Sequence, residues 1–250
     1  MIPGTCRLCL QDTQLCNSHV LPEFAYKPMY DKKRFMMMKT DPHKAVQFKQ
    51  KGLREHLLCQ ECDNVRLGRL EKYMKEIFMD GRDIKSHRCG GEIWIEGFEY
   101  AKCKLYHLSL LWRMSISDLP IFSQVSLGSQ HEEQLRRRLM DDDPGEPEDY
   151  PFFAVLPTIE NQWYEDYITQ PAPLRIGPHR AYILVITGIL YLFGTNRELV
   201  RSHLKGWKDG LLKKDGRWKI LTMEAKDIPY LNTFFAQQAQ AERRRKAQRQ

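Results

Sequence analysis

The sequence predicts an α+β protein with two domains, and three observations support this prediction. Two C-x-x-C cysteine pairs lie near the N-terminus, separated by 49 residues. Apolar residues recur at helical spacing in several segments, whereas the region after residue 152 carries short β-branched and aromatic runs. A chain of 250 residues with 42% hydrophobic residues is long enough to bury such a core. We expect an N-terminal domain over residues 1–88 and a C-terminal domain of unknown role over residues 89–250.

The N-terminal domain is expected to contain two strands followed by a helix. A short hairpin and an extended strand lead to Ser18 and His19, and Pro22 stops regular pairing just beyond them. Residues 53–58 form a plausible second strand. The period then changes, and residues 63–79 are predicted to be one helix because their apolar side chains fall on one face. These apolar residues are Leu67, Leu70, Met74 and Ile77.

The C-terminal domain is expected to mix helices with antiparallel strands. Its most apolar helix should lie in the core, and an acidic segment interrupted by prolines cannot pack a core and is expected to be a loop. An Asp215-Gly216 turn between two short runs indicates a hairpin. The expected elements are a strand at 93–100, the apolar helix at 101–115, a charged helix at 131–140, the acidic loop at 141–149, antiparallel strands from 152, a helix from about 228 and a basic tail at 241–250.

Cys6, Cys9, Cys59 and Cys62, the members of the two C-x-x-C pairs, are the expected ligands of a structural zinc ion. Four thiolates close a tetrahedral shell and leave no open position for water, so such an ion stabilises the fold and does no chemistry. The alternative is four buried thiols without a metal. Two such pairs in a chain that starts without a secretory leader are more typical of metal binding than of disulfides.

Cysteine usage and hydropathy favour a soluble, cytoplasmic protein. Seven cysteines is an odd number, and the chain reaches Cys6 without a charged and then apolar leader. The longest apolar run, residues 181–193, is shorter than the roughly 17–25 residues that a membrane helix needs. We therefore expect a reducing compartment and no membrane partner.

Positive charge is concentrated in the N-terminal domain. The formal net charge is +7, and residues 1–88 hold 17 Lys and Arg against 11 Asp and Glu. Within residues 24–51, lysines alternate with aromatic residues, a composition that suits a phosphate backbone and unstacked bases but also an ordinary solvated loop. The residues expected to bind nucleic acid are Lys32, Lys33, Arg34 and Arg54.

The order of C-x-x-C, a strand ending in Ser18-His19-Val20-Leu21-Pro22, and Leu57-Leu58-Cys59-x-x-Cys62 opening a helix resembles the zinc-stabilised HNH, or ββα-metal, endonucleases over residues 5–79. The resemblance implies that zinc clamps a β-hairpin onto a helix. It also implies that His19 is the general base and that a catalytic Mg²⁺ or Mn²⁺ lies between strand and helix. An imidazole near neutral pKa can take a proton from water, while the cation stabilises charge on the phosphate.

Three positions differ from the family pattern. Ser18 stands where the family has Asp or His, Arg54 stands where it has Asn, and Asp63 stands where His or Asn is common. Asp63 is thus the remaining ionisable metal ligand. The chain also resembles a group of bacterial HNH-like proteins up to about residue 155, through Ser18 to Phe24 and through a Leu-Trp-Arg-x-Ser motif at 111–115. This second resemblance implies bacterial defence against phage as a setting.

Each assignment has a structural alternative. His19 could be a strand-end residue hydrogen-bonded to the backbone or a substitute zinc ligand, and Asp63 could cap the helix. Glu71 and Lys75 would form a surface ion pair, and Trp112 would be a core residue. The alternative function is a catalytically degenerate HNH fold that binds nucleic acid or a protein partner, including a second copy of itself, without cleavage.

Overall fold

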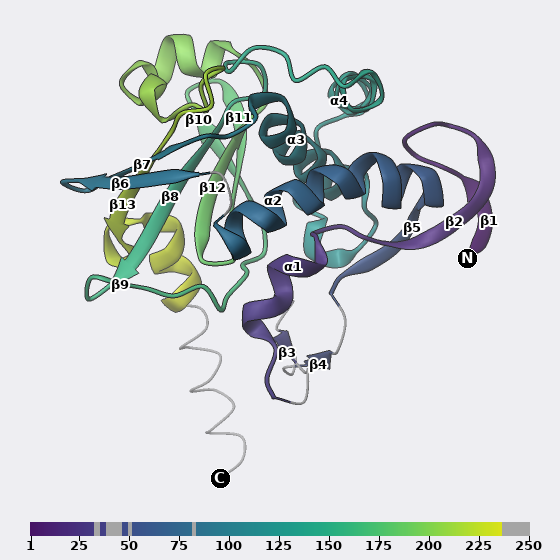
Figure 1. Ribbon diagram of the computed structural model, residues 1–250, viewed down its shortest axis with the longest axis horizontal. Helices are drawn as coiled ribbons and strands as arrows, with labels where there is room; N and C mark the ends of the chain where they lie inside the picture. The colour runs from purple at the N-terminus through teal and green to yellow at the C-terminus, as the bar shows by residue number, and fades with distance from the viewer. Residues whose placement is uncertain (33–35, 39–46, 50–51, 82–83, 237–250) are drawn as a thin grey trace.

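The protein is a mixed α+β structure in which helices lie between two sheets. The computed structural model describes residues 1–32, 36–38, 47–49, 52–81 and 84–236 (Figure 1). Lys33, Arg34 and the basic tail at 241–250, all named from the sequence, lie outside the described residues. No helix in these ranges is both long and apolar enough to cross a membrane.

A small antiparallel sheet contains the strands expected near the N-terminus. Strands β1 (Ile2–Thr5), β2 (Asp12–His19) and β5 (Arg54–Cys59) pair in the order β1-β2-β5, and the β2–β5 register shifts between Cys16 and Asn17. His19 is the last residue of β2 and lies opposite Arg54, the first residue of β5. The pairing therefore places the two side chains at one end of the sheet.

A continuous helical segment follows β5, as the apolar spacing predicts. It consists of the π-helical turn η2 (Glu61–Leu67) and the α-helix α2 (Gly68–Asp80). Leu67, Leu70, Met74 and Ile77 are all buried. The helix ends where Gly81 adopts a left-handed conformation with φ of 61°, which a residue without a Cβ adopts without strain.

The segment between β2 and β5 begins with two short helical turns. They are α1 (Glu23–Tyr26) and η1 (Lys27–Met29), and they are followed by the paired strands β3 (Met36–Met38) and β4 (Gln47–Lys49). Phe24, Ala25 and Tyr26 are buried. Part of the segment expected to be a basic loop is therefore packed against the core.

The larger sheet has eight strands within the described residues, in the order β10-β11-β12-β8-β13-β7-β6, with β9 added to β8. Neighbouring strands are antiparallel except for β8 and β13. The expected hairpin around Asp215-Gly216 is wrong, because no strand precedes the turn and β13 pairs with β7 and β8 instead. The strands are β6 (Lys85–Cys89), β7 (Glu92–Glu96), β8 (Phe152–Ile159), β9 (Gln162–Trp163), β10 (Ala172–Ile176), β11 (His179–Ile186), β12 (Ile189–Gly194) and β13 (Trp218–Glu224).

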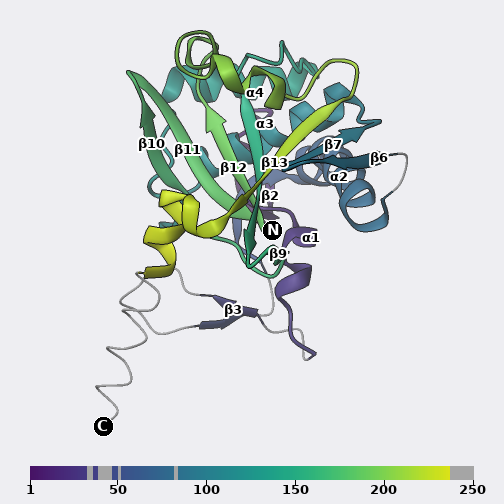
Figure 2. The ribbon, with the colours of Figure 1, turned by 90° about the vertical axis from the view of Figure 1, so that its left-hand side faces the viewer.

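Helix α3 (Tyr100–Ile116) is the central element of the core. One side packs on the large sheet, where the His107 ring lies 4.0 Å from the ring of Phe152 in β8, and the helix also packs against α2. Figure 2 shows the large sheet in front of α2 and α3. A single cluster of buried side chains runs from Leu8 through Leu105 to Trp218. The boundary expected after residue 88 falls inside β6.

The remaining helices lie around this core. Helix α4 (Ser129–Asp141) follows the turn η3 (Pro120–Phe122) and packs against α3. The acidic loop that follows α4 is held by ion pairs, among them Asp149 with Arg138 and Arg197. The last described elements are η4 (Leu199–His203), η5 (Lys205–Gly210), η6 (Ala225–Asp227) and a helical segment at 229–236.

Candidate metal centre and the adjacent polar site

The first cysteine pair lies on a tight turn between β1 and β2. The amide of Cys6 donates to the carbonyl of Gln11 at 2.9 Å, and the amide of Leu10 donates to the carbonyl of Cys6 at 2.8 Å. Leu10 has a φ of 63°, so the chain reverses direction directly after Cys9. The amide of Arg7 donates to the carbonyl of Leu57 at 2.9 Å, which attaches this turn to the end of β5.

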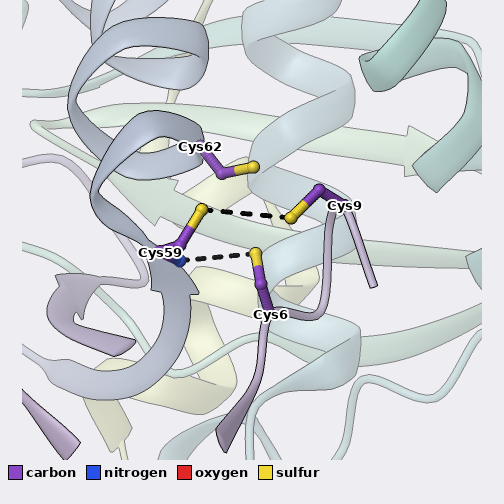
Figure 3. A group of neighbouring side chains, drawn as sticks. All are labelled: Cys6, Cys9, Cys59 and Cys62. Atoms are coloured by element: carbon purple, nitrogen blue, oxygen red, sulfur yellow. Dashed lines mark hydrogen bonds between the residues drawn. The ribbon is translucent and has the colours of Figure 1, made fainter. Parts of the chain in front are cut away.

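The second pair lies where β5 passes into the helix, with Cys59 as the last strand residue and Cys62 in the first helical turn. All four cysteine Sγ atoms lie within 4.8 Å of one another, and Sγ of Cys9 is 3.9 Å from Sγ of Cys59 (Figure 3). A tetrahedron of thiolates around zinc has sulfur atoms about 3.8 Å apart. The two pairs, separated by 49 residues in the sequence, therefore meet in the fold, and the four side chains could hold a metal ion such as zinc.

The surroundings of the cysteines also suit a bound cation. The amide of Cys59 donates to Sγ of Cys6 at 3.3 Å, a contact that stabilises a thiolate. Burial raises the pKa of the Cys62 thiol in the metal-free chain, so metal binding must displace its proton. All seven cysteines of the chain are free.

Helix α4 is attached to this cysteine cluster from outside. Nη1 of Arg136 donates to the carbonyl of Leu8, inside the first C-x-x-C turn, at 2.8 Å. In return, Nη1 of Arg66 in η2 donates to the carbonyl of Met140 at 2.8 Å. No local pattern indicates these contacts, because their partners are more than 70 residues apart in the sequence.

His19 lies a short way along the sheet from the cysteines, at the end of β2. Its Nε2 accepts a hydrogen bond from Nε of Arg54 at 2.9 Å and also contacts Oε2 of Glu23. Burial lowers the pKa of the imidazole, the Arg54 guanidinium lowers it further, and the Glu23 carboxylate acts in the opposite direction. The side chain is 16% exposed. His19 is therefore neutral at neutral pH, with Nε2 as the acceptor and the proton on Nδ1.

The two contacts of His19 require different states of Nε2. Without a proton, Nε2 accepts from Arg54, whereas with a proton it donates to Glu23. The guanidinium of Arg54 also reaches Oε2 of Glu23 through Nη2 at 3.4 Å, so the three side chains form one cluster. Arg54, predicted to bind nucleic acid, is thus a partly buried neighbour of the predicted base.

Asp63 does not cap the helix, so this structural alternative is wrong. The helix begins at Glu61, its N-cap residue Gln60 has no side-chain cap, and Asp63 lies within the first turns. The buried hydroxyl of Ser18, the residue before His19, donates to the carbonyl of Cys16 at 3.5 Å and also acts on the Asp63 carboxylate. Burial raises the pKa of Asp63, while the Arg113 charge and the Ser18 hydrogen bond lower it. The two residues predicted to be catalytic are therefore linked through adjacent backbone positions.

Arg113 is a member of the site that the sequence analysis did not identify. It comes from the Leu-Trp-Arg-x-Ser motif in α3, its side chain is fully buried, and its Nη1 donates to Oε1 of Glu71 at 2.6 Å and to the carbonyl of His19 at 3.0 Å. In the structure Glu71 thus pairs with the buried Arg113, whereas the sequence predicted a surface pair with Lys75. An arginine in the mostly apolar segment 108–116 of this helix was the available signal. Trp112 is a core residue, as expected.

The described residues contain one group of three or more metal-binding side chains, and it is the cysteine cluster. His19, Asp63, Glu23 and Glu71 do not converge into a second such group. Lys32 is exposed at the end of the described part of its loop. The structure therefore assembles a candidate zinc centre and a polar cluster around His19 without a ready-made second metal cage in the part of the chain it describes.

The fold and the cysteine cluster define the class of this protein as an α+β protein with a candidate four-cysteine metal centre. Comparisons of the chain with protein-family models, with curated proteins and with solved structures found no match.

Proposed function

We propose that the protein is a metal-dependent endonuclease that hydrolyses DNA phosphodiester bonds, with His19 as the general base. The observation that carries the proposal is the cluster at the end of β2. There, His19, Glu23, Arg54, Asp63 and Arg113 are contributed by five different elements. Burial lowers the pKa of His19 and raises that of Asp63, and perturbed pKa values cluster at functional sites. The sequence resemblance to HNH nucleases assigns the same histidine.

The cluster contains a general base and a cationic side chain, two of the chemical groups that hydrolysis of a phosphodiester requires. A neutral imidazole with a free electron pair at Nε2 can accept a proton from water once Arg54 has turned toward a phosphate oxygen. Arg54 and the exposed Lys32 provide cations for the backbone of the substrate. Nucleic acid, with DNA as the substrate, is the proposed partner.

Two ions are part of the proposal. Zinc at Cys6, Cys9, Cys59 and Cys62 holds the first C-x-x-C turn against the helix. Mg²⁺ often takes only one or two carboxylates from a protein and completes its shell with water and substrate phosphates, and Asp63 is the carboxylate that fits this role here. When bound, such an ion would stabilise negative charge on the phosphate. The proposed setting is the reducing cytoplasm of a bacterium, in defence against phage.

A second function is favoured by two specific features. Arg54 occupies the electron pair of His19, and Ser18, which has no ionisable ligand atom, stands where HNH nucleases have a metal ligand. Both features suit a catalytically degenerate HNH fold that binds nucleic acid or a protein partner without cleaving it.

A cleavage assay separates the two functions. Purified full-length protein is incubated at neutral pH with supercoiled plasmid and with single-stranded DNA, with and without Mg²⁺ or Mn²⁺. His19→Ala is compared with His87→Ala, a matched control because His87 is exposed on β6. Cleavage by the wild type and the control, but not by His19→Ala of equal zinc content, supports the nuclease. Equal inactivity of all three with DNA binding retained would favour the binding function, and cleavage by His19→Ala would exclude the assigned base.

A further inference from the structure

Arg113 is a charged side chain with no exposed surface, in contact with the backbone of His19 and close enough to Asp63 for its charge to act on that carboxylate. Its guanidinium donates through Nη1 to the carbonyl of His19 at 3.0 Å and to Oε1 of Glu71 at 2.6 Å. Nε and Nη2 face the carbonyl and the hydroxyl of Ser109, one turn earlier in α3, both at 3.4 Å. Every arm of the guanidinium therefore has a partner.

Stability alone does not explain a buried arginine at this position. Removing a guanidinium from water carries a large penalty, and buried ion pairs are often no more stabilising than apolar residues of similar volume. The neighbouring positions of α3 are filled by apolar residues such as Trp112 and Met114, both buried. The charge at position 113 therefore needs a reason other than packing.

The position of the His19 carbonyl supplies that reason. The β2–β5 ladder ends at the His19–Arg54 pair. Beyond it, the two segments are joined by a hydrogen bond from the amide of Val20 to the carbonyl of Leu53 at 3.1 Å. The His19 carbonyl lies at this end of the ladder, and Arg113 provides a donor to it. Loss of this donor would leave a partly buried carbonyl unpaired, a cost that a shift of the strand end would relieve.

The end of α3 holds the opposing strand in a similar way. The Ser117 hydroxyl donates to Oε2 of Glu55 at 2.6 Å, and the amide of Asp118 donates to the same carboxylate. Glu55 is adjacent to Arg54 on β5. Helix α3 thus attaches to the strand that carries His19 and to the strand that carries its partner.

We propose that Arg113 is a positioning residue for His19, so that α3 completes the site formed by β2, β5 and η2. Arg113 fixes the backbone of His19, Glu71 balances its charge, and the same charge acts on Asp63. The groups that face His19 are then Glu23 from α1, Arg54 from β5, and Glu71 and Arg113 from α2 and α3. The expected effect of Arg113 on catalysis rests on the proposed nuclease function. Its effect on the placement of the His19 ring does not.

The test compares Arg113→Met, Arg113→Lys and Glu71→Gln with the exposed control Arg88→Met in the full chain. Histidine ¹⁵N NMR follows the His19 ring, identified by the signals missing from His19→Ala, through a pH titration. We expect Arg113→Met to bind zinc like the wild type but to displace the His19 ring signals and their titration, with smaller changes in Arg113→Lys. In the cleavage assay we expect kcat to fall about 100-fold with little change in KM, as for a base displaced by about 1 Å.

The outcomes separate this inference from the proposed function. His19 signals and titration in Arg113→Met that coincide with those of the wild type would overturn the positioning role. If Arg113→Met does not fold, the His19 signals of the wild type are compared with those of Glu71→Gln and Arg113→Lys instead. These two variants keep a polar group at each position. A wild type that cleaves nothing would refute the nuclease but leave the NMR comparison decisive for Arg113.

Discussion

Nε of Arg54 donates to Nε2 of His19 at 2.9 Å, so the guanidinium and the imidazole form a pair that requires a neutral histidine. Glu23 contacts the same nitrogen and would be the partner of a protonated ring. Burial lowers the pKa of His19, and the Arg54 cation and the Glu23 carboxylate then compete by acting on it in opposite directions.

This competition predicts the effect of Arg54→Gln on His19. Glutamine keeps a hydrogen-bonding group but removes the positive charge that lowers the pKa of His19, while Glu23 stays in place. We expect the pKa of His19 to rise, measured by histidine ¹⁵N NMR titration. Arg88→Gln, at an exposed position of β6, is the control. A His19 pKa that stays the same or falls would contradict this account of the cluster.

Zinc content tests the cysteine cluster directly. The four sulfur positions predict one zinc ion per chain, and Cys59→Ser is expected to lose it and to unfold the first sheet, since structural zinc sites contribute folding energy outright. Metal analysis by mass spectrometry and thermal unfolding are the measurements. Cys89→Ser, at an exposed thiol outside the cluster, should keep both zinc and stability. A Cys59→Ser protein with unchanged metal content would refute the assignment.

The Arg136 contact with Leu8 predicts a more subtle effect on the metal centre. Arg136→Met removes the donor to a carbonyl inside the first C-x-x-C turn, and loss of such outer contacts typically weakens metal binding about 10–100-fold. We expect one zinc per chain but weaker retention in competition with a chelator. Arg137→Met is a matched control, because Arg137 shares the partner Glu133 but is 69% exposed. Equal zinc affinity in the two variants would show that α4 does not support the centre.

The sequence predicted the features that depend on local pattern and missed those that depend on distant packing. Two C-x-x-C pairs, the helix at 63–79 and the apolar helix at 101–115 follow from spacing alone, and the structure contains all of them. The turn at Asp215-Gly216 has hairpin chemistry, yet residues 211–214 before it form no strand, and β13 pairs with β7 and β8 instead.

The partners of the charged residues in the polar site also depend on distant packing and could not be predicted from the sequence. Sequence proximity favours Lys75 as the partner of Glu71, but the buried guanidinium of Arg113 is brought to it by the packing of α3 on α2. Glu23 likewise reaches His19 because the chain turns at Pro22 into α1. Which charges pair depends on which elements pack together, so a single sequence identifies the charged residues but not their pairs.

The burial of His107 predicts how stability depends on pH. Its ring is stacked on Phe152 at 4.0 Å and lies edge-on to Trp218, and Nδ1 is 2.7 Å from the carbonyl of Cys103. Burial lowers its pKa from 6.5 to about 3. Between these values the unfolded chain binds a proton at His107 and the folded chain does not. The free energy of unfolding should therefore decrease as the pH falls through this range, by up to about 1.4 kcal/mol per pH unit from this group.

His107→Phe removes the titrating group while keeping an aromatic ring of similar shape. We expect its free energy of unfolding, measured with urea at several pH values between about 6.5 and 4, to fall less steeply than that of the wild type. Carboxylate protonation and loss of zinc at low pH act on both chains alike, so the difference between the two curves reports the imidazole. Parallel curves would mean that His107 is protonated in the folded protein, and Nε2, which lacks a hydrogen-bond partner among the described residues, would then have to reach water.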